Sequence, residues 1–383
     1  MEYFLKDGSL TIKLSGELNS GNAAQIESEI LSITSKESFS SLILDLENLT
    51  YISSAGLRVV LKMRKTCGDF EVVNACLDVY DVFEMTGFTS MINIKKALKK
   101  IDVKDAQLIG EGYCSYVYRI DKDTIIKVFK RATDIGEVQR ELDMAKQAFI
   151  LGIPTAISFD IVKVQNKFGV RFEMLDCKSL RDLLRDEPEK FDDYLAKYAH
   201  LLETIGETES NSTALPDVKE SFFDRLLFLK ERFEPSAYEK LYGFLSSIPE
   251  SGTFVHGDCH IKNIMVRDEE FFLIDMDTLS RGHRIFEYAL LYCPYVAFEE
   301  DQPGNSMDFF GLPAETLQRV FYGLVDAYLG PSHSEKSLDY IKILGYLHML
   351  WWNRKNEPQN NKRFDGCYHR LLALMEKYPD LRY

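Results

Sequence analysis

The sequence predicts two successive folds: an α/β domain over residues 1–98, then a larger α+β region that begins with strands and ends in helices. Three observations predict this. Strands alternate with helices through the first 98 residues, which is typical of an α/β domain. A glycine-containing strand pair and a helix follow residue 106, and a polar loop near residue 258 lies between short strands. At 383 residues the chain also exceeds one ordinary core, which favours two or three domains.

Bulk composition excludes several functional classes. A formal charge of −14 argues against nucleic acid or an anionic membrane as the main partner. The longest apolar run, residues 288–298, is shorter than the roughly 18 residues of a membrane span. Residues 1–6 lack the basic start and apolar run of a signal peptide. Seven cysteines without a Cys-x-x-Cys pair indicate neither a disulfide framework nor a zinc site. We therefore expect a cytoplasmic protein with reduced thiols.

The elements of the first domain follow from local patterns. Strands at 3–7 and 9–14 are separated by Asp7-Gly8, which is a hairpin signal. Helical spacing of apolar residues, or compact apolar runs, predict the other elements: helices at 22–33, 55–63 and 79–85, and strands at 42–46 and 70–73. Residues 95–104 carry several lysines without a Pro or Gly run, and we expect a short linker at 99–105.

The segment from Asp45 to Arg58 runs from a strand through a turn into a helix that opens at a serine, Ser54. A serine in this place is by default an N-cap. The segment resembles the STAS domains of bacterial anti-sigma factor antagonists, whose signature is a strand ending in Asp, an apolar turn, and Asp-Ser-x-Gly-Leu opening a helix. The other markers of that family fall at 16–18, 73–74 and 85–88.

This resemblance covers about residues 1 to 98. It implies an anti-sigma factor or another signalling protein as a partner, and it places Ser54 at the position that those proteins phosphorylate to release the partner. One departure is that Ser53 stands where the family has an acidic residue. A plain helix cap therefore remains the alternative interpretation of Ser54.

The polar loop between residues 254 and 266 organises the second region. It holds Asp258 and, five positions later, Asn263. Strands at 264–266 and 271–274 predict a hairpin that sets Asn263 beside Asp275, roughly 5 Å apart at Cα, with Asp258 above them. Amide and carboxylate oxygens suit Mg²⁺, and Asp258 is then available to accept a proton. This arrangement is typical of phosphoryl-transfer sites of the protein-kinase type; simple loop caps are the alternative.

A loop with two glycines, Gly110 and Gly112, lies earlier in the sequence than the polar loop. Gly110 and Gly112 allow backbone N–H groups to approach and cradle phosphates, and Ser115 stands where protein kinases have a third glycine. The following apolar strand, 124–129, contains Lys127 in a setting where a plain surface lysine is unexpected. Lys130 is the nearby alternative.

A lysine in that place needs a carboxylate to orient it. Residues from Asp134 to Glu137 predict a capping box at the start of a helix that extends to about residue 151. Glu141 lies on the same face as Glu137, eleven residues before Gly152-Ile153-Pro154. That spacing favours Glu141 as the partner of the lysine, and Glu137 as a helix cap.

Together these motifs make residues 106 to about 350 resemble the aminoglycoside phosphotransferase and choline kinase group of small-molecule kinases, which have His-Gly-Asp in place of the His-Arg-Asp of protein kinases. The resemblance implies a bilobal kinase-like fold, with a small and mostly antiparallel β lobe at 106–177 and a large helical lobe at 178–383. It implies Asp258 as the catalytic base, Asn263 and Asp275 as Mg²⁺ ligands, and an ATP site that includes Gly110, Gly112, Ser115, Lys127, Glu141 and the backbone of a hinge at Glu173 and Leu175. His256 would brace the loop, and His260 receives no role.

We therefore expect an ATP- and Mg²⁺-dependent phosphotransferase that acts on a hydroxyl, more readily of a small molecule than of a protein, fused to a STAS module. Gly282 and a helix from 285 follow so soon that no protein-kinase activation loop fits. Residues 299–301 and 351–352 are candidates for the acceptor site, but we prefer to interpret them as a solvated loop and as core aromatics. The alternative function is a nucleotide-sensing scaffold, a pseudokinase, whose STAS domain binds a signalling partner. Phosphorylation of Ser54 by the kinase-like half is a hypothesis motivated by the fusion.

Overall fold

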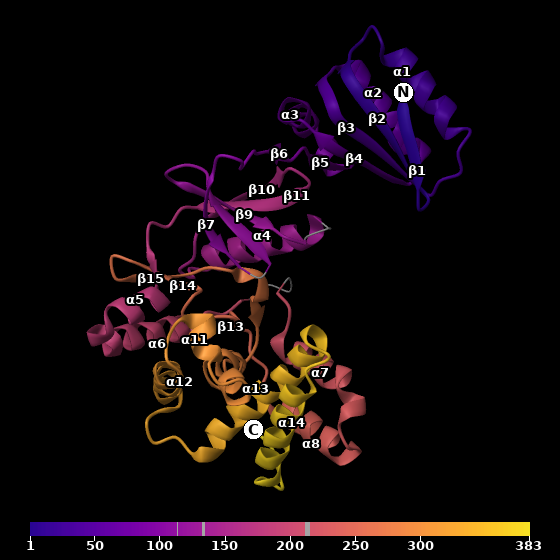
Figure 1. The fold of residues 1–383 in the computed structure, drawn as a ribbon. Helices are drawn as coiled ribbons and strands as arrows, with labels where there is room; N and C mark the ends of the chain where they lie inside the picture. Colours follow the sequence, from indigo (N-terminus) through magenta and orange to yellow (C-terminus); the bar gives the residue numbers. More distant parts are fainter. Residues whose placement is uncertain (113, 132–134, 211–214) are drawn as a thin grey trace. The chain divides into compact units, whose positions relative to one another are not determined.

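The computed structural model describes residues 1–112, 114–131, 135–210 and 215–383. The chain divides into two compact units, Met1–Ile101 and Asp102–Tyr383. The first unit is α/β, and the second begins with a mostly antiparallel sheet and continues into helices (Figure 1). The fold class predicted from the sequence is confirmed.

The first unit is built on a sheet with the strand order β1-β2-β3-β4-β5. β1 is antiparallel to β2 across Asp7 and Gly8, whose φ angles of 50° and 80° give the predicted hairpin turn. The other neighbouring strands are parallel. The elements are β1 (Glu2–Lys6), β2 (Ser9–Leu18), α1 (Ala23–Thr34), β3 (Ser41–Ile52), α2 (Ser54–Thr66), β4 (Asp69–Ala75), α3 (Leu77–Met85), β5 (Asn93–Lys96) and β6 (Lys99–Lys100).

The last strand of this sheet differs from the expectation. β5 pairs in parallel with β4, so Lys95 and Lys96 belong to the sheet rather than to the lysine-rich connection. Only Ile94 of this strand is apolar, and it packs against the core of the first unit. An edge strand with one inward side chain lacks the alternation that makes a strand visible in a sequence.

The second unit opens with the sheet order β10-β11-β9-β8-β7, in which neighbouring strands are antiparallel. Ile126 and Val128 of the central strand β9 are buried, and α4 packs on β10 and β11. The elements are β7 (Gln107–Glu111), β8 (Ser115–Arg119), β9 (Thr124–Phe129), α4 (Ile135–Ile150), β10 (Ser158–Val164) and β11 (Lys167–Glu173).

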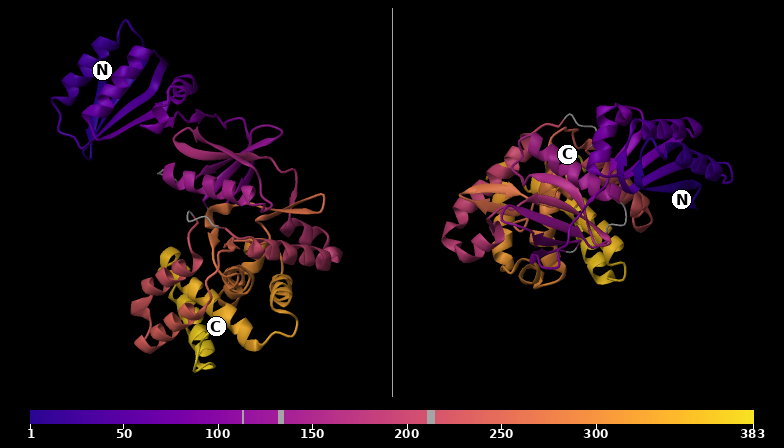
Figure 2. Two further views of the ribbon diagram at one scale, coloured as in Figure 1. Left: turned by 180° about the vertical axis from the view of Figure 1, so that it is seen from behind. Right: turned by 90° about the horizontal axis from the view of Figure 1, so that it is seen from above.

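Helices dominate the remainder of the second unit (Figures 1 and 2). They are α5 (Leu180–Asp186), α6 (Phe191–Glu207), α7 (Val218–Phe228), α8 (Pro235–Ser247), α9 (Ile285–Tyr292), α10 (Phe298–Asp301), α11 (Asn305–Phe310), α12 (Ala314–Leu329), α13 (Glu335–Asn356) and α14 (Asn361–Glu376). Short strands carry the polar loop: β12 (Lys178–Ser179), β13 (Phe254–Val255), β14 (Ile264–Arg267), β15 (Glu270–Leu273) and β16 (Ser280–Arg281). Buried side chains of these helices and strands form one continuous core, on which the polar loop rests.

Candidate active site

Lys127 connects strand β9 to two carboxylates. Its Nζ lies 2.6 Å from Glu141 Oε1 on α4 and 2.6 Å from Asp275 Oδ1 just after β15. Because side chains alternate along a strand, the burial of Ile126 and Val128 on one face turns Lys127 to the other. Burial lowers the pKa of Lys127, but Asp275 and Glu141 outweigh it and leave the pKa above its ordinary value. The lysine therefore stays cationic.

Glu141 is the buried partner on α4, only 5% exposed. Burial raises the pKa of its carboxyl and Lys127 opposes that rise. Glu137 is exposed one turn earlier. The capping box expected from Asp134 lies outside the described residues.

The glycine loop joins β7 to β8. The N–H of Gly112 donates to the carbonyl of Ser115 at 3.0 Å, which closes the turn. Lys130, the alternative to Lys127, binds this loop instead: its Nζ lies 2.8 Å from Glu111 Oε1 and 2.8 Å from the carbonyl of Gly112. Gly110 lies within β7, with Val117 of β8 alongside. Tyr113, in the middle of this loop, lies outside the described residues.

The predicted hinge follows β11. The N–H groups of Glu173 and Met174 donate to the carbonyls of Ile157 and Asp123, at 2.9 and 2.8 Å. Leu175 comes next and is buried. Among the described residues no backbone carbonyl accepts from the N–H of Leu175. A donor at this point is what a nucleobase edge requires.

Asp258 and Asn263 meet within the polar loop. Asn263 Nδ2 donates to the carbonyl of Asp258 at 2.9 Å and to Asp258 Oδ2 at 3.0 Å. In the hairpin, Ile264 pairs with Leu273, so Asn263 aligns with Ile274 and not with Asp275. Asp275 follows one place later in the left-handed region, with a φ of 67°. The expected side-by-side placement of Asn263 and Asp275 is thus displaced by one residue, and the φ value of Asp275 marks where the strand ends.

Three buried side chains hold the backbone of the polar loop by hydrogen bonds. Glu287 on α9 is buried, and its Oε2 accepts hydrogen bonds from the N–H groups of His256, at 2.6 Å, and Gly257, at 3.1 Å. Tyr198 donates its hydroxyl to the carbonyl of Cys259, and the N–H of Ile261 donates to the hydroxyl of Tyr295 at 2.9 Å. None of Glu287, Tyr198 and Tyr295 was singled out from the sequence.

His256 links the loop to the end of the hairpin. Its Nε2 contacts the carbonyl of Ile274 at 3.2 Å, and its Nδ1 accepts from the N–H of Asp258 at 3.3 Å. Burial lowers its pKa to about 4, so the ring is neutral and makes both bonds. This geometry matches the bracing role implied by the family resemblance.

Several carboxyl groups of the loop and of the residues after the hairpin have shifted pKa values. Surrounding protein and the charge of Asp275 raise the pKa of Asp258 to about 7, and the Asn263 donor opposes the rise. Although burial raises the pKa of Asp275, Lys127 holds it below its ordinary value. Asp277, which sequence reasoning missed, adds a further carboxyl whose pKa is raised to about 7 by its surroundings and by Asp275. The Asp-x-Asp spacing was the available signal for it.

The other acceptor-site candidates have internal partners. Glu299 accepts from the N–H groups of Gly304 and Ser306 at 2.6 and 2.7 Å. Glu300 accepts from two tyrosine hydroxyls, and Asp301 pairs with Arg370. Trp351 and Trp352 are half-buried among other rings. The solvated loop expected at residues 299–301 is therefore wrong, because these residues belong to α10 and have internal partners, whereas the two tryptophans pack against other rings as expected.

The first unit places Ser53 and Ser54 in different roles. Ser53 is the N-cap of α2, and its side chain accepts from the N–H of Gly56 at 3.3 Å. Ser54 is the first residue of the helix and is exposed. The plain cap considered for Ser54 therefore belongs to Ser53. Asp45 was expected to end a strand at 42–46, but β3 continues to Ile52 and Asp45 lies within it, where its Oδ1 accepts from Asn74 Nδ2 at 2.9 Å.

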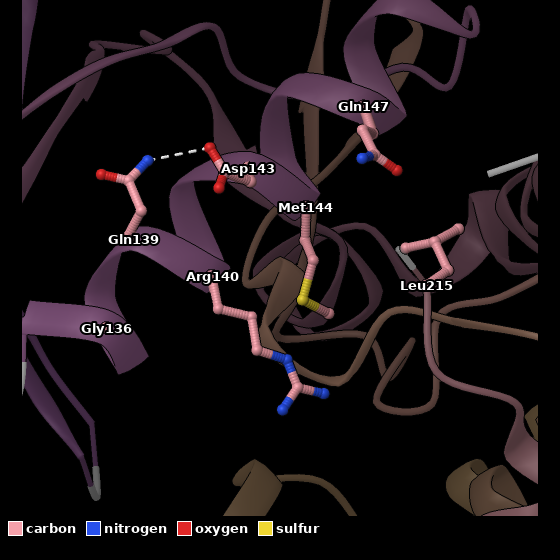
Figure 3. A pocket seen from close by; sticks show the side chains of 7 residues that line it. All are labelled: Gly136, Gln139, Arg140, Asp143, Met144, Gln147 and Leu215. Atoms are coloured by element: carbon pink, nitrogen blue, oxygen red, sulfur yellow. Dashed lines mark hydrogen bonds between the residues drawn. The ribbon is translucent and has the colours of Figure 1, made fainter. Parts of the chain in front are cut away.

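A hollow of about 260 Å³ lies along α4 (Figure 3). Side chains of α4 line it together with Leu215. Its α4 residues are Gly136, Gln139, Arg140, Asp143, Met144 and Gln147. Glu141 points to a different face of α4, because each residue turns the helix by roughly 100°. The hollow is therefore separate from the Lys127 site.

Comparisons with known proteins identify the families to which the two parts of the chain are similar. A profile described as the phosphotransferase enzyme family matches residues 105–310, more than half of the chain. The chain belongs to the phosphotransferase enzyme family. A STAS domain profile matches residues 5–101. A Bordetella bronchiseptica protein named "Putative anti-sigma factor antagonist BtrV" is 40% identical over 92 residues, 23% of this chain and 78% of that protein.

Similar solved structures include the following two. One is the GDP and kanamycin complex of APH(2'')-IIia, 13% identical with a TM-score of 0.48, covering 78% of this chain and 98% of that chain. The other is an aminoglycoside-3'-phosphotransferase of type VIII, 16% identical with a TM-score of 0.43, covering 62% of this chain and 92% of that one. Among the described residues no helix of this phosphotransferase is both long and apolar enough to cross a membrane.

Proposed function

We propose that the second unit transfers the γ-phosphoryl group of ATP to a hydroxyl of a small molecule, with Mg²⁺ bound. The observation that carries the proposal is Lys127, whose Nζ meets both Glu141 and Asp275 at 2.6 Å. Lys127 thereby joins the strand beside the glycine loop to the carboxylate that follows the hairpin. Its ion pair with Glu141 is of the strand-lysine and helix-glutamate type that kinase-type sites require for transfer.

The residues present fit a magnesium site. Both contacts of the Asn263 amide nitrogen go to Asp258, which turns its oxygen away, and Lys127 contacts only one oxygen of Asp275. Mg²⁺ takes one or two protein oxygens and completes its shell with phosphate and water. The described residues hold no cluster of three or more His, Cys, Asp or Glu suited to a metal, and such a site needs none. When bound, Mg²⁺ neutralises charge on the phosphate oxygens.

Each protein group then has one role. Asp258 accepts the proton of the acceptor hydroxyl as the hydroxyl oxygen attacks the γ-phosphorus, and Asn263 orients the Asp258 carboxylate. Lys127, held by Glu141, binds phosphate oxygens and stabilises charge in the transition state. The backbone at Gly110, Gly112 and Ser115 covers the phosphates, and the backbone at Glu173 and Leu175 pairs with adenine.

The test is ADP formation from Mg-ATP in the presence of a panel of hydroxyl compounds. Asp258→Asn keeps the shape of the side chain, so nucleotide binding should persist while transfer falls by about 10²- to 10⁴-fold. If wild-type protein binds ATP tightly but transfers to none of the panel, the nucleotide-sensing scaffold becomes the better description. If it does not bind ATP at all, both functions are wrong.

For the first unit, we propose docking to a protein partner of the anti-sigma factor type, controlled by phosphorylation of Ser54. Support comes from the relative's name and from the exposed position of Ser54 in the first turn of α2. A phosphate there is held by free N–H groups and adds charge without unfolding the helix. The formal charge of −14 supports our proposal that nucleic acid is not a direct partner. Seven cysteines without a Cys-x-x-Cys pair support a cytoplasmic location with reduced thiols.

Mass spectrometry of the full chain after incubation with Mg-ATP, beside Asp258→Asn, tests whether the phosphotransferase modifies Ser54 itself. Phosphate on Ser54 in the wild type and not in the variant would support self-modification. An unmodified Ser54 in both would exclude it. Docking is tested separately by comparing Ser54→Ala and Ser54→Asp in a binding assay with an anti-sigma factor.

A further inference from the structure

Lys262 is the first of two cations beside the catalytic loop. It lies in the loop itself, four residues after Asp258. Its Nζ is 4.3 Å from the ring centroid of Phe309 and 3.5 Å from the carbonyl oxygen of the same residue. The side chain is therefore laid against α11, and Phe309 remains 46% exposed.

Arg181 is the second cation. Its N–H donates to the carbonyl of Ile261 at 3.0 Å, which places the start of α5 directly beside Lys262. Its guanidinium reaches Gly311 at the end of α11: a Cβ atom built on this glycine would lie 3.7 Å from Arg181 Nη1. Two cations from different elements thus approach the same end of α11.

The positive charge of this pair is only partly neutralised. Among the described residues Lys262 has no carboxylate within ion-pair distance. Asp182 lies 3.2 Å from Arg181 but also 3.2 Å from Arg185, so one carboxylate serves two guanidinium groups.

Contacts connect this pair to Asp258. His260 Nε2 lies 3.5 Å from Asp258 Oδ1, and its ring meets the ring of Phe309 edge-on at 5.6 Å. The same Phe309 carries Lys262 on its face. His260 and Phe309 therefore link Lys262 to Asp258 through direct contacts. The acidic residues 299–301 are occupied by internal partners and do not supply a counter-charge.

We propose that the acceptor is an anionic alcohol, whose carboxylate or phosphate binds Arg181 and Lys262 while its hydroxyl faces Asp258. The inference rests on the proposed phosphotransferase function. The alcohol oxygen forms a bond to the γ-phosphorus of ATP, the bond between that phosphorus and the β,γ-bridging oxygen breaks, and the hydroxyl proton passes to Asp258. The products are a phosphate ester and ADP. Guanidinium and ammonium groups are the usual partners of carboxylate and phosphate.

The test uses isothermal titration of the full chain in the presence of Mg²⁺ and a non-hydrolysable ATP analogue. The probes are glycerol, D-glycerate and glycerol 3-phosphate, which share a hydroxyl and differ in the anion, with kanamycin as a cationic competitor. Glycerate and glycerol 3-phosphate should bind at least tenfold more tightly than glycerol, and their ratio distinguishes a carboxylate site from a phosphate site. In Lys262→Gln and Arg181→Gln that preference should fall at least tenfold, with nucleotide affinity within twofold of wild type. Lys362→Ala removes an exposed lysine of α14 and should change nothing.

The outcomes separate the two levels of the proposal. If the nucleotide analogue does not bind wild-type protein, the proposed function itself fails. If the analogue binds but neither anion does, or kanamycin binds better than both, the anionic acceptor is wrong. If Lys262→Gln and Arg181→Gln weaken the nucleotide instead of the anions, the cations bind the γ-phosphate and the inference is also overturned. Thermal unfolding of both variants at the wild-type temperature excludes misfolding as the cause.

Discussion

Replacing Glu287 with alanine should destabilise the phosphotransferase unit by several kcal/mol. The change leaves the N–H groups of His256 and Gly257, now 2.6 and 3.1 Å from Glu287 Oε2, without their acceptor in a buried place. Each unsatisfied buried donor costs about 1–3 kcal/mol. Near pH 6 the carboxyl is mostly protonated, because burial raises its pKa to about 7, so little is regained by removing a charge. We expect a loss of roughly 3 kcal/mol.

Differential scanning calorimetry of the full chain measures this, with hydrogen exchange of peptides from residues 254–263 as the local readout. A loss of that size lowers the midpoint by roughly 6–12 °C in a unit of this length, and exchange of the loop should accelerate. Glu287→Gln keeps an oxygen acceptor and should lose about a third as much. Glu207→Ala removes an exposed glutamate of α6 and should stay within about 0.5 kcal/mol of wild type. If Glu287→Ala behaved like Glu207→Ala in both assays, the loop would not depend on this carboxyl.

Four other outcomes are expected. Folding raises the pKa of Glu287 from 4.5 to about 7, so the folded state binds the carboxyl proton of Glu287 more tightly than the unfolded state does. The free energy of unfolding of the wild-type protein should therefore fall relative to that of Glu287→Gln by on the order of 3 kcal/mol as pH rises from 4.5 through 7. Parallel pH profiles of the two proteins would contradict this. Lys127→Met should lower phosphoryl transfer at least about 100-fold in the ADP assay, whereas unchanged turnover would leave the lysine without a role. Gly56→Ala should destabilise the STAS unit by about 2 kcal/mol in urea titration, because its Cβ would lie 2.7 Å from a carbonyl oxygen of β2; a neutral result would mean that the strand yields. Ser53→Ala should cost about 1 kcal/mol through loss of the cap and Ser54→Ala should stay within about 0.5 kcal/mol, so the reverse order would refute the assignment of the cap.

The sequence was informative where residues a few positions apart carry the signal. The Asp7-Gly8 turn, the strand around Lys127 and the helix that carries Glu141 all follow from local pattern, and the structure has them. The cap of α2 was predicted one residue too late, because adjacent serines offer the same hydroxyl and only the backbone decides between them. Ser53 has an extended ψ of 173°, whereas Ser54 is already helical.

Residues that act across long separations were missed. Glu287 contacts a loop 30 residues earlier, and Tyr198 contacts a carbonyl 61 residues later. A hydrophobic pattern cannot show such partners. The one available signal for Glu287 was a lone acidic residue in the otherwise apolar helix 285–292, whose side chains are all buried. A buried carboxylate requires hydrogen-bond donors. A single glutamate in an apolar helix therefore indicates that donors from another part of the chain contact it.

The polar loop that holds Asp258 is contacted by two separate groups of residues. Glu287, Tyr198 and Tyr295 fix the backbone from the core side, whereas Arg181 and Phe309 reach the loop from separate elements, α5 and α11. Under the function proposed above, substitutions in those two short helices would change which acceptor is recognised and leave the proposed catalytic groups in place. Among relatives with an unchanged loop, α5 and α11 are the segments in which different acceptors should have left different residues.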